Sequence, residues 1–224
     1  MKTLVQQVMI NSGSMNRVGS DDSGFIAKNI MYTARDYAEH NGYDYKLVDT
    51  LDPLLEPLPE NKHLKGMKYC LEMFLHLDQP DYDQILCLDA DMYITGRTPK
   101  LPAIKAVAGA GVDCHVVVPW KTERKLVITG GFWLFTRPAA KLIHDYFRQR
   151  ITNWENDPLF TNGDYHNEIL LAEFLKDNTD IEYESLGYEW NWFHSYLETG
   201  KYIYHITGAD KQKRYQDVTR YCIS

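Results

Sequence analysis

Two hydrophobic periods alternate along the first half of the chain. Short apolar runs at 4–9, 45–48 and 84–88 are typical of buried strands. Between them, apolar residues recur every three or four positions over 25–41 and 64–77, which predicts two amphipathic helices. This strand–helix order favours an α/β fold: a doubly wound, mostly parallel (mixed) sheet with helices on both faces.

The second half has a less regular pattern, and no long linker separates it from the first. We therefore expect one domain over residues 1–224. The pattern predicts further strands at 114–118, 129–135, 181–183 and 202–205, and helices at 138–150 and 165–176.

Charge and composition exclude several classes of partner. The chain has 24 basic and 31 acidic residues, a net charge of −7, which argues against a nucleic-acid partner. No apolar stretch is long enough to predict a membrane span. The N-terminus lacks a signal-peptide pattern and the four cysteines are scattered, so we expect reduced thiols and a cytoplasmic location.

The segment QILCLDADMYI carries the strongest chemical signal. An apolar strand ends in Asp89 and Asp91, and residues two apart on an extended chain point the same way. Two carboxylates at the end of a buried strand would repel each other and lose hydration. A divalent cation relieves both costs, since such ions sit on carboxylates and substrate phosphates. The segment therefore predicts a metal that holds a phosphorylated donor, although two surface acids can also end a strand without any ligand.

A second motif, H-x-x-G-x-x-K, lies near the C-terminus. His205 offers a neutral imidazole as a third metal ligand. Gly208 would let the backbone approach a diphosphate, and Lys211 would supply a positive charge to a phosphate oxygen.

Together, LDADMYI and the distal HITGADK resemble the GT-A glycosyltransferases, especially the glycogenin and lipopolysaccharide-galactosyltransferase type. The resemblance implies that Asp89, Asp91 and His205 bind Mn²⁺, with Mg²⁺ as the alternative. It also implies that Gly208 and Lys211 bind the diphosphate of a nucleotide sugar, and that Lys68 contacts the same donor. Where the family usually continues with Pro-Trp, this chain has Gln212-Lys213.

Two further segments fit this resemblance. Gly130-Gly131 resembles the small-residue strand that lines the donor-sugar pocket, and a bulge or a close packing contact is the alternative. His166-Asn167-Glu168 resembles the His-Asp-Glu motif of the blood-group and α-galactosyltransferase type. That likeness implies Glu168 as nucleophile or charge stabiliser, with Asn167 and His166 holding sugar hydroxyls. The alternative is an acid that the helix dipole favours.

The resulting hypothesis is a metal-dependent glycosyltransferase that moves a sugar from a nucleoside-diphosphate sugar to a hydroxyl acceptor with retention. Residues 1–95 would form the nucleotide-binding half and 96–224 the sugar and acceptor half. A glycan, a lipid-linked sugar or a protein remains open as acceptor. The aromatic residues over 188–196 would form a sugar platform or a second small core. The alternatives are a nucleotidyltransferase, a non-catalytic sugar- or nucleotide-binding module, and a phosphatase of the haloacid-dehalogenase kind.

Overall fold

A six-stranded mixed sheet forms the centre of the molecule. The computed structural model describes residues 1–9, 22–61, 67–110, 114–117, 124–127, 130–163, 165, 167–192, 198–206 and 210–221. The strand order is β2 (Asp44–Val48), β1 (Thr3–Val8), β3 (Gln84–Asp89), β8 (Phe132–Thr136), β5 (Val107–Ala110) and β9 (Tyr183–Leu186). β1 is parallel to β2 and β3, and β5 is parallel to β9. β8 is antiparallel to both of its neighbours. The predicted α/β fold with a mostly parallel, mixed sheet is confirmed.

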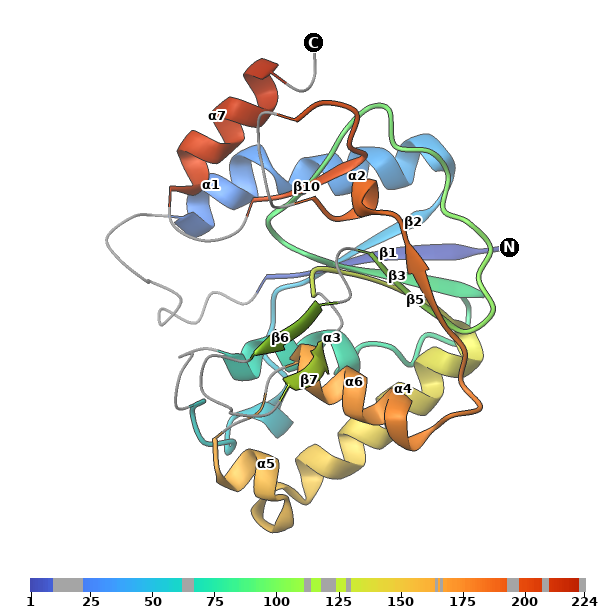
Figure 1. Cartoon of the computed structure of the whole chain (residues 1–224), viewed down its shortest axis with the longest axis vertical. Helices are drawn as coiled ribbons and strands as arrows, with labels where there is room; N and C mark the ends of the chain where they lie inside the picture. Colours follow the sequence, from blue (N-terminus) through green and yellow to red (C-terminus); the bar gives the residue numbers. More distant parts are fainter. Residues whose placement is uncertain are drawn as a thin grey trace.

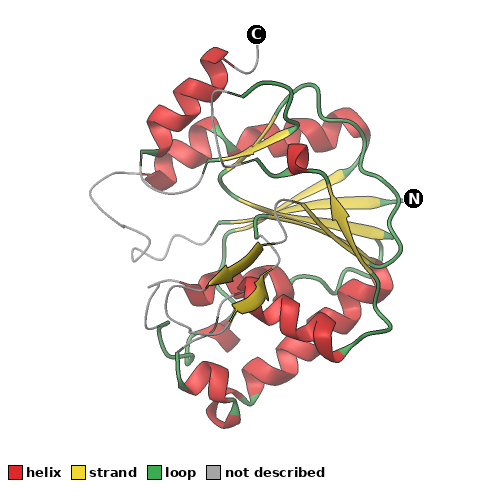
Figure 2. Ribbon diagram, viewed as in Figure 1, coloured by secondary structure: helices red, strands yellow, loops and turns green. Residues whose placement is uncertain are grey.

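Helices cover both faces of this sheet (Figures 1 and 2). One face carries α3 (Glu72–Leu75), α4 (Arg137–Thr152) and α6 (Asn167–Asp177). The other carries α1 (Asp22–Asn29), α2 (Met31–Asn41) and α7 (Lys211–Tyr221). The remaining short helices are η1 (Pro53–Leu55), η2 (Met67–Leu71), η3 (Trp154–Asn156), α5 (Pro158–Thr161) and η4 (Tyr188–Trp190).

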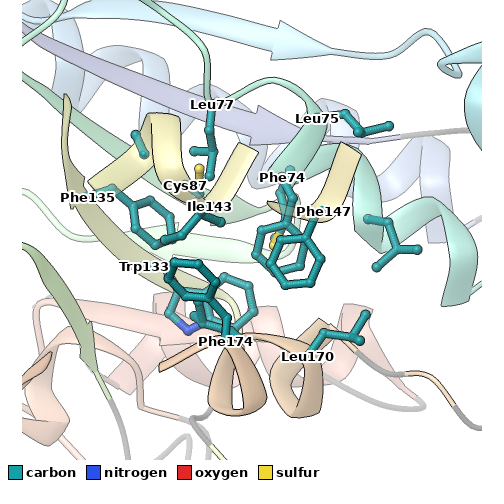
Figure 3. Close-up of a cluster of buried hydrophobic side chains, with 14 of the residues drawn as sticks. Phe74, Leu75, Leu77, Cys87, Trp133, Phe135, Ile143, Phe147, Leu170 and Phe174 are labelled. Carbon is teal, nitrogen blue, oxygen red and sulfur yellow. The ribbon is translucent and has the colours of Figure 1, made fainter. Parts of the chain in front are cut away.

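Alternation along the central strands divides the core between the two faces. In β3, Ile85 and Cys87 pack into the cluster that faces α3 and α4, while Leu86 and Leu88 pack into the cluster that faces α2. Stacked rings dominate the first cluster (Figure 3). The ring of Phe74 lies 4.2 Å from that of Phe147 and 5.7 Å from that of Trp133, between ring centroids. The strand β3, which ends at Asp89, is therefore held in place by packing on both faces of the sheet.

Two small sheets flank the central one. β4 (Met92–Ile94) pairs antiparallel with β10 (Ile203–His205), so that His205 lies opposite Met92. This pairing brings the C-terminal motif beside the end of β3. β6 (Cys114–Val117) pairs with β7 (Arg124–Val127) outside the main sheet.

Two predicted helices differ from the observed ones. The prediction of one helix over 64–77 is wrong, because the described part is the 3₁₀ helix η2 followed by the single α-turn of α3. The run Leu71–Leu75 is buried on all sides, so its side chains do not form one stripe. The helix expected over 25–41 is divided at Ile30 into α1 and α2. Among the described residues, none of the helices combines the length and apolar character that a membrane crossing requires.

Candidate functional site

Asp89, Asp91 and His205 converge at one end of the sheet. Asp89 ends β3, Asp91 lies in the turn before β4, and His205 ends β10. One ligand atom from each lies within 4.8 Å of the others. The Nε2 atom of His205 lies 3.2 Å from an Asp91 oxygen and 3.6 Å from an Asp89 oxygen. Two carboxylates and an imidazole in this arrangement form a donor set that suits a divalent cation.

Positive groups compensate the two acids in this arrangement. Lys211 pairs with Asp91 and also donates to the carbonyl of Ile206 at 2.9 Å. Burial alone would raise the pKa of Asp91, but the charges and hydrogen bonds of His205 and Lys211 lower it overall. Burial raises the pKa of Asp89. Burial opposes charge on His205, yet the two acids outweigh it and raise its pKa. The acid pair therefore attracts positive charge.

Gly131 lies directly against the imidazole of His205. Its φ of +96° favours glycine, and a Cβ atom built there would lie 2.6 Å from His205 Cε1. Its carbonyl accepts a 3.0 Å hydrogen bond from the Asp89 amide. The close packing contact that the sequence left open is therefore present here, and it touches two of the three candidate ligands.

Gly130 has the same relation to Glu168. A Cβ atom at Gly130 would lie 2.7 Å from Glu168 Oε1, and the Gly130 amide donates to that oxygen at 2.5 Å. Glu168 lies in the first turn of α6 and is partly buried. Burial raises its pKa to about 7, Asp89 adds to the effect, and the Gly130 amide and His205 oppose it. Burial therefore dominates the pKa of Glu168, which also lies close enough to Asp89 to sense its charge.

Asn191 contacts both the ring of His205 and the backbone of Gly130. Its side chain is 1% exposed, and its Nδ2 donates to the carbonyls of Ala110 (3.0 Å) and Gly130 (2.8 Å). Its Oδ1 lies 3.2 Å from His205 Nδ1. Sequence analysis did not identify Asn191. The available signal was a single amide between Trp190 and Trp192, which could not be distinguished from a surface polar residue.

Two other predicted site residues make different contacts. Lys68 is buried, pairs with Glu60 at 3.1 Å and donates to the carbonyl of Leu58 at 3.3 Å. Asn167 is buried and its Nδ2 lies 3.7 Å from the sulfur of Met73, in the core. Neither is placed in the Asp89–Asp91–His205 cluster by these contacts, and their roles toward a donor remain predictions. His166 and Gly208 lie outside the described residues.

Within the described part of the aromatic segment, Trp190 is buried, Trp192 is partly buried and Tyr188 is 52% exposed. Trp190 is 7% exposed and packs its ring against Phe132 at 5.7 Å and Tyr202 at 5.2 Å, between centroids. Lys201 lies 3.7 Å above the ring of Trp192. Trp190 and Trp192 therefore fit the small-core interpretation, whereas Tyr188 does not belong to the core.

Comparisons with known proteins give a likeness in structure. No family model matches the chain, and no curated protein matches it. Among solved structures, a glycosyltransferase involved in the glycosylation of the major capsid of PBCV-1 aligns with a TM-score of 0.59 and 12% sequence identity. The alignment covers 98% of this chain and 100% of that one. At this identity the likeness concerns architecture, and the chain has the α/β fold of that glycosyltransferase.

Proposed function

We propose that this protein is a glycosyltransferase that uses a divalent cation and a nucleoside-diphosphate sugar, and transfers the sugar to a hydroxyl acceptor. The observation that carries the proposal is the convergence of Asp89 and Asp91, from the end of β3 and the turn after it, with His205 from β10. The fold likeness to a glycosyltransferase supports the same reaction class. Mn²⁺ is the expected ion, because an imidazole beside two carboxylates suits it better than Mg²⁺.

The residues of the cluster suit a reaction in which a diphosphate leaves. The bond between the anomeric carbon and the diphosphate oxygen breaks, and the electron pair stays on the diphosphate. A cation held by Asp89, Asp91 and His205 would neutralise that developing charge. Lys211 lies beside Asp91, and its ammonium group would be available to a phosphate oxygen of the donor.

Glu168 suits a retaining reaction. Its ionised oxygen would either attack the anomeric carbon, forming a glycosyl ester that the acceptor hydroxyl then displaces, or stabilise positive charge there. In both routes the acceptor proton passes to an oxygen of the departing diphosphate. A pKa near 7 leaves roughly half of the Glu168 carboxyl groups ionised at neutral pH, so the ionised oxygen is available for either role.

The test is turnover of nucleotide sugars. Purified protein is incubated with a panel of uridine and guanosine diphosphate sugars and Mn²⁺, and release of nucleoside diphosphate is measured with and without a chelator. We expect release that stops on chelation and falls at least 100-fold in Asp91→Asn. The matched control is Asp145→Asn, which removes an exposed carboxylate on α4 that pairs with Lys141.

Three results would reject the proposal. One is turnover that persists in the chelator, and a second is equal turnover by Asp91→Asn and the control. A third is formation of sugar nucleotide from nucleoside triphosphate, which would indicate the nucleotidyltransferase alternative. The acceptor is then sought by adding glycans, lipid-linked sugars or proteins to the donor that turns over, and retention is read from the anomeric configuration of the product.

A further inference from the structure

Asn191 has a hydrogen-bond arrangement that admits a single orientation of its amide. Both N–H groups of Nδ2 face backbone carbonyls, those of Ala110 and Gly130, and a carbonyl can only accept. The oxygen Oδ1 must therefore be the atom that faces His205 Nδ1 at 3.2 Å. Because the side chain is 1% exposed, water does not compete for these bonds.

This orientation determines which nitrogen of His205 carries the proton in the neutral ring. An amide oxygen accepts and cannot donate, so Nδ1 must be the N–H. In the neutral ring Nε2 then carries the lone pair, and Nε2 is the atom that lies 3.2 Å from Asp91 and 3.6 Å from Asp89. Metal-binding histidines require this division, with one nitrogen on the ion and the other donating to a fixed acceptor.

The backbone around Asn191 fixes its distance to the ring. The Trp192 amide donates to the Ile203 carbonyl at 3.0 Å, and the His205 amide donates to the Trp192 carbonyl at 2.8 Å. The residue after Asn191 is thus bonded in both directions to β10, the strand that ends at His205. The imidazole and the amide therefore belong to one hydrogen-bonded unit, with Gly131 packed against the ring.

We propose that Asn191 is a positioning residue that holds His205 in the Nδ1–H tautomer and aims Nε2 at the acid pair, and that through the Gly130 backbone it sets the spacing between the cation site and Glu168. The Gly130 carbonyl accepts from Asn191 while the Gly130 amide donates to Glu168. Both hydrogen bonds are therefore made by the backbone of one residue, Gly130. This inference rests on the cation site of the proposed function.

The first experiment measures Mn²⁺ affinity without any turnover. Electron paramagnetic resonance counts free Mn²⁺ during titration of wild type, Asn191→Ala and Gln84→Ala. Gln84 is 1% exposed and donates from Nε2 to the Pro102 carbonyl at 3.1 Å, at the opposite end of β3 from Asp89. Both variants lose a buried amide, but only one loses the contact with His205. We expect Asn191→Ala to bind Mn²⁺ 10- to 100-fold more weakly and Gln84→Ala to bind as wild type does.

The second experiment needs no variant. Wild-type protein labelled with ¹⁵N at histidine is loaded with Zn²⁺, a diamagnetic ion that imidazole binds readily. We expect the nuclear magnetic resonance spectrum to show that the ring proton of His205 is bonded to Nδ1. A proton on Nε2 would overturn the inference even if Asn191→Ala does not fold.

The remaining outcomes separate this inference from the proposed function. If the Mn²⁺ affinities of wild type and Asn191→Ala lie within twofold of each other, the positioning role is overturned and the cation site remains intact. An equal loss in Gln84→Ala would also overturn it, since the effect would then follow from general destabilisation. Failure of wild type to bind Mn²⁺ would instead reject the proposed metal-dependent function, and the role of Asn191 with it.

Discussion

Replacing Gly131 with alanine tests how rigidly the candidate metal centre is built. The new Cβ would lie 2.6 Å from His205 Cε1, and ordinary contact begins near 3.4 Å, so the ring must move by roughly 0.8 Å. Metal coordination tolerates about 0.2 Å. The buried imidazole cannot move away freely, because Asn191 and Asp91 hold its two nitrogens. We therefore expect Gly131→Ala to weaken Mn²⁺ binding at least 10-fold.

The same substitution also strains the backbone, and a control separates the two effects. A φ of +96° costs a non-glycine residue about 1–3 kcal/mol. Gly200 has a φ of +80°, and a Cβ atom there would meet nothing within 4 Å. In urea unfolding, Gly131→Ala and Gly200→Ala should both lose roughly 1–3 kcal/mol from backbone strain. In calorimetric titration with Mn²⁺, only Gly131→Ala should lose affinity. Equal Mn²⁺ affinity in the two variants would refute the reasoning.

Three further predictions concern Glu168 and the core. Glu168 has a pKa raised to about 7, so the folded state binds its proton more tightly than the unfolded state, and the resulting stabilisation is lost as pH rises through 7. Glu168→Gln keeps an acceptor for the Gly130 amide, so its melting temperature should exceed that of wild type at pH 8 and equal it at pH 4. The exposed control Glu155→Gln should have the melting temperature of wild type at both pH values. Equal melting of Glu168→Gln and wild type at pH 8 would contradict the raised pKa. Gly130→Ala places a Cβ atom 2.7 Å from Glu168 Oε1 and should lower the rate of sugar transfer at least 10-fold with little change in Mn²⁺ affinity, and an unchanged rate would exclude Glu168 from the reaction. Phe74→Ala removes a ring stacked on two others and should lower the free energy of unfolding in urea by about 3–5 kcal/mol. The control Leu142→Ala, at a 53% exposed position, should lower it by less than about 1 kcal/mol. A loss below about 2 kcal/mol for Phe74→Ala would mean that the stack is not tightly packed.

Periodicity predicted β1, β2 and β3 because each is a short run that turn-forming residues separate from the segments on either side. It failed over 64–77, where spacings of three and four fit an α-helix but the chain forms η2 and one turn of α3. It did not predict β5, whose sequence VAGA has small residues with weak strand preference. That segment is a strand because β8 and β9 bond to it on both sides.

The residues of the candidate site also differ in how far the sequence alone could predict them. Asp89 and Asp91 could be read from local sequence, since two residues and one strand end define their geometry. His205 required the resemblance, because no local rule pairs β10 with β4. Asn191 could not be predicted, since its significance lies in contacts with three segments that are distant in the sequence. The contacts of Gly130 with Glu168 and of Gly131 with His205 likewise depend on how α6 and β10 pack in the folded chain.

The pairing of β10 with β4 also bears on how the chain is made. Lys211 and Asp91 are separated by 120 positions, and the strand that carries His205 also comes long after the two acids in the sequence. Until β10 and α7 have been synthesised, the nascent chain holds two neighbouring acids without the imidazole and the ammonium group that pair with them in the folded protein. A product that ended before β10 would therefore lack both the third candidate ligand and the ammonium group of Lys211, and the acid pair would have neither of its positive partners.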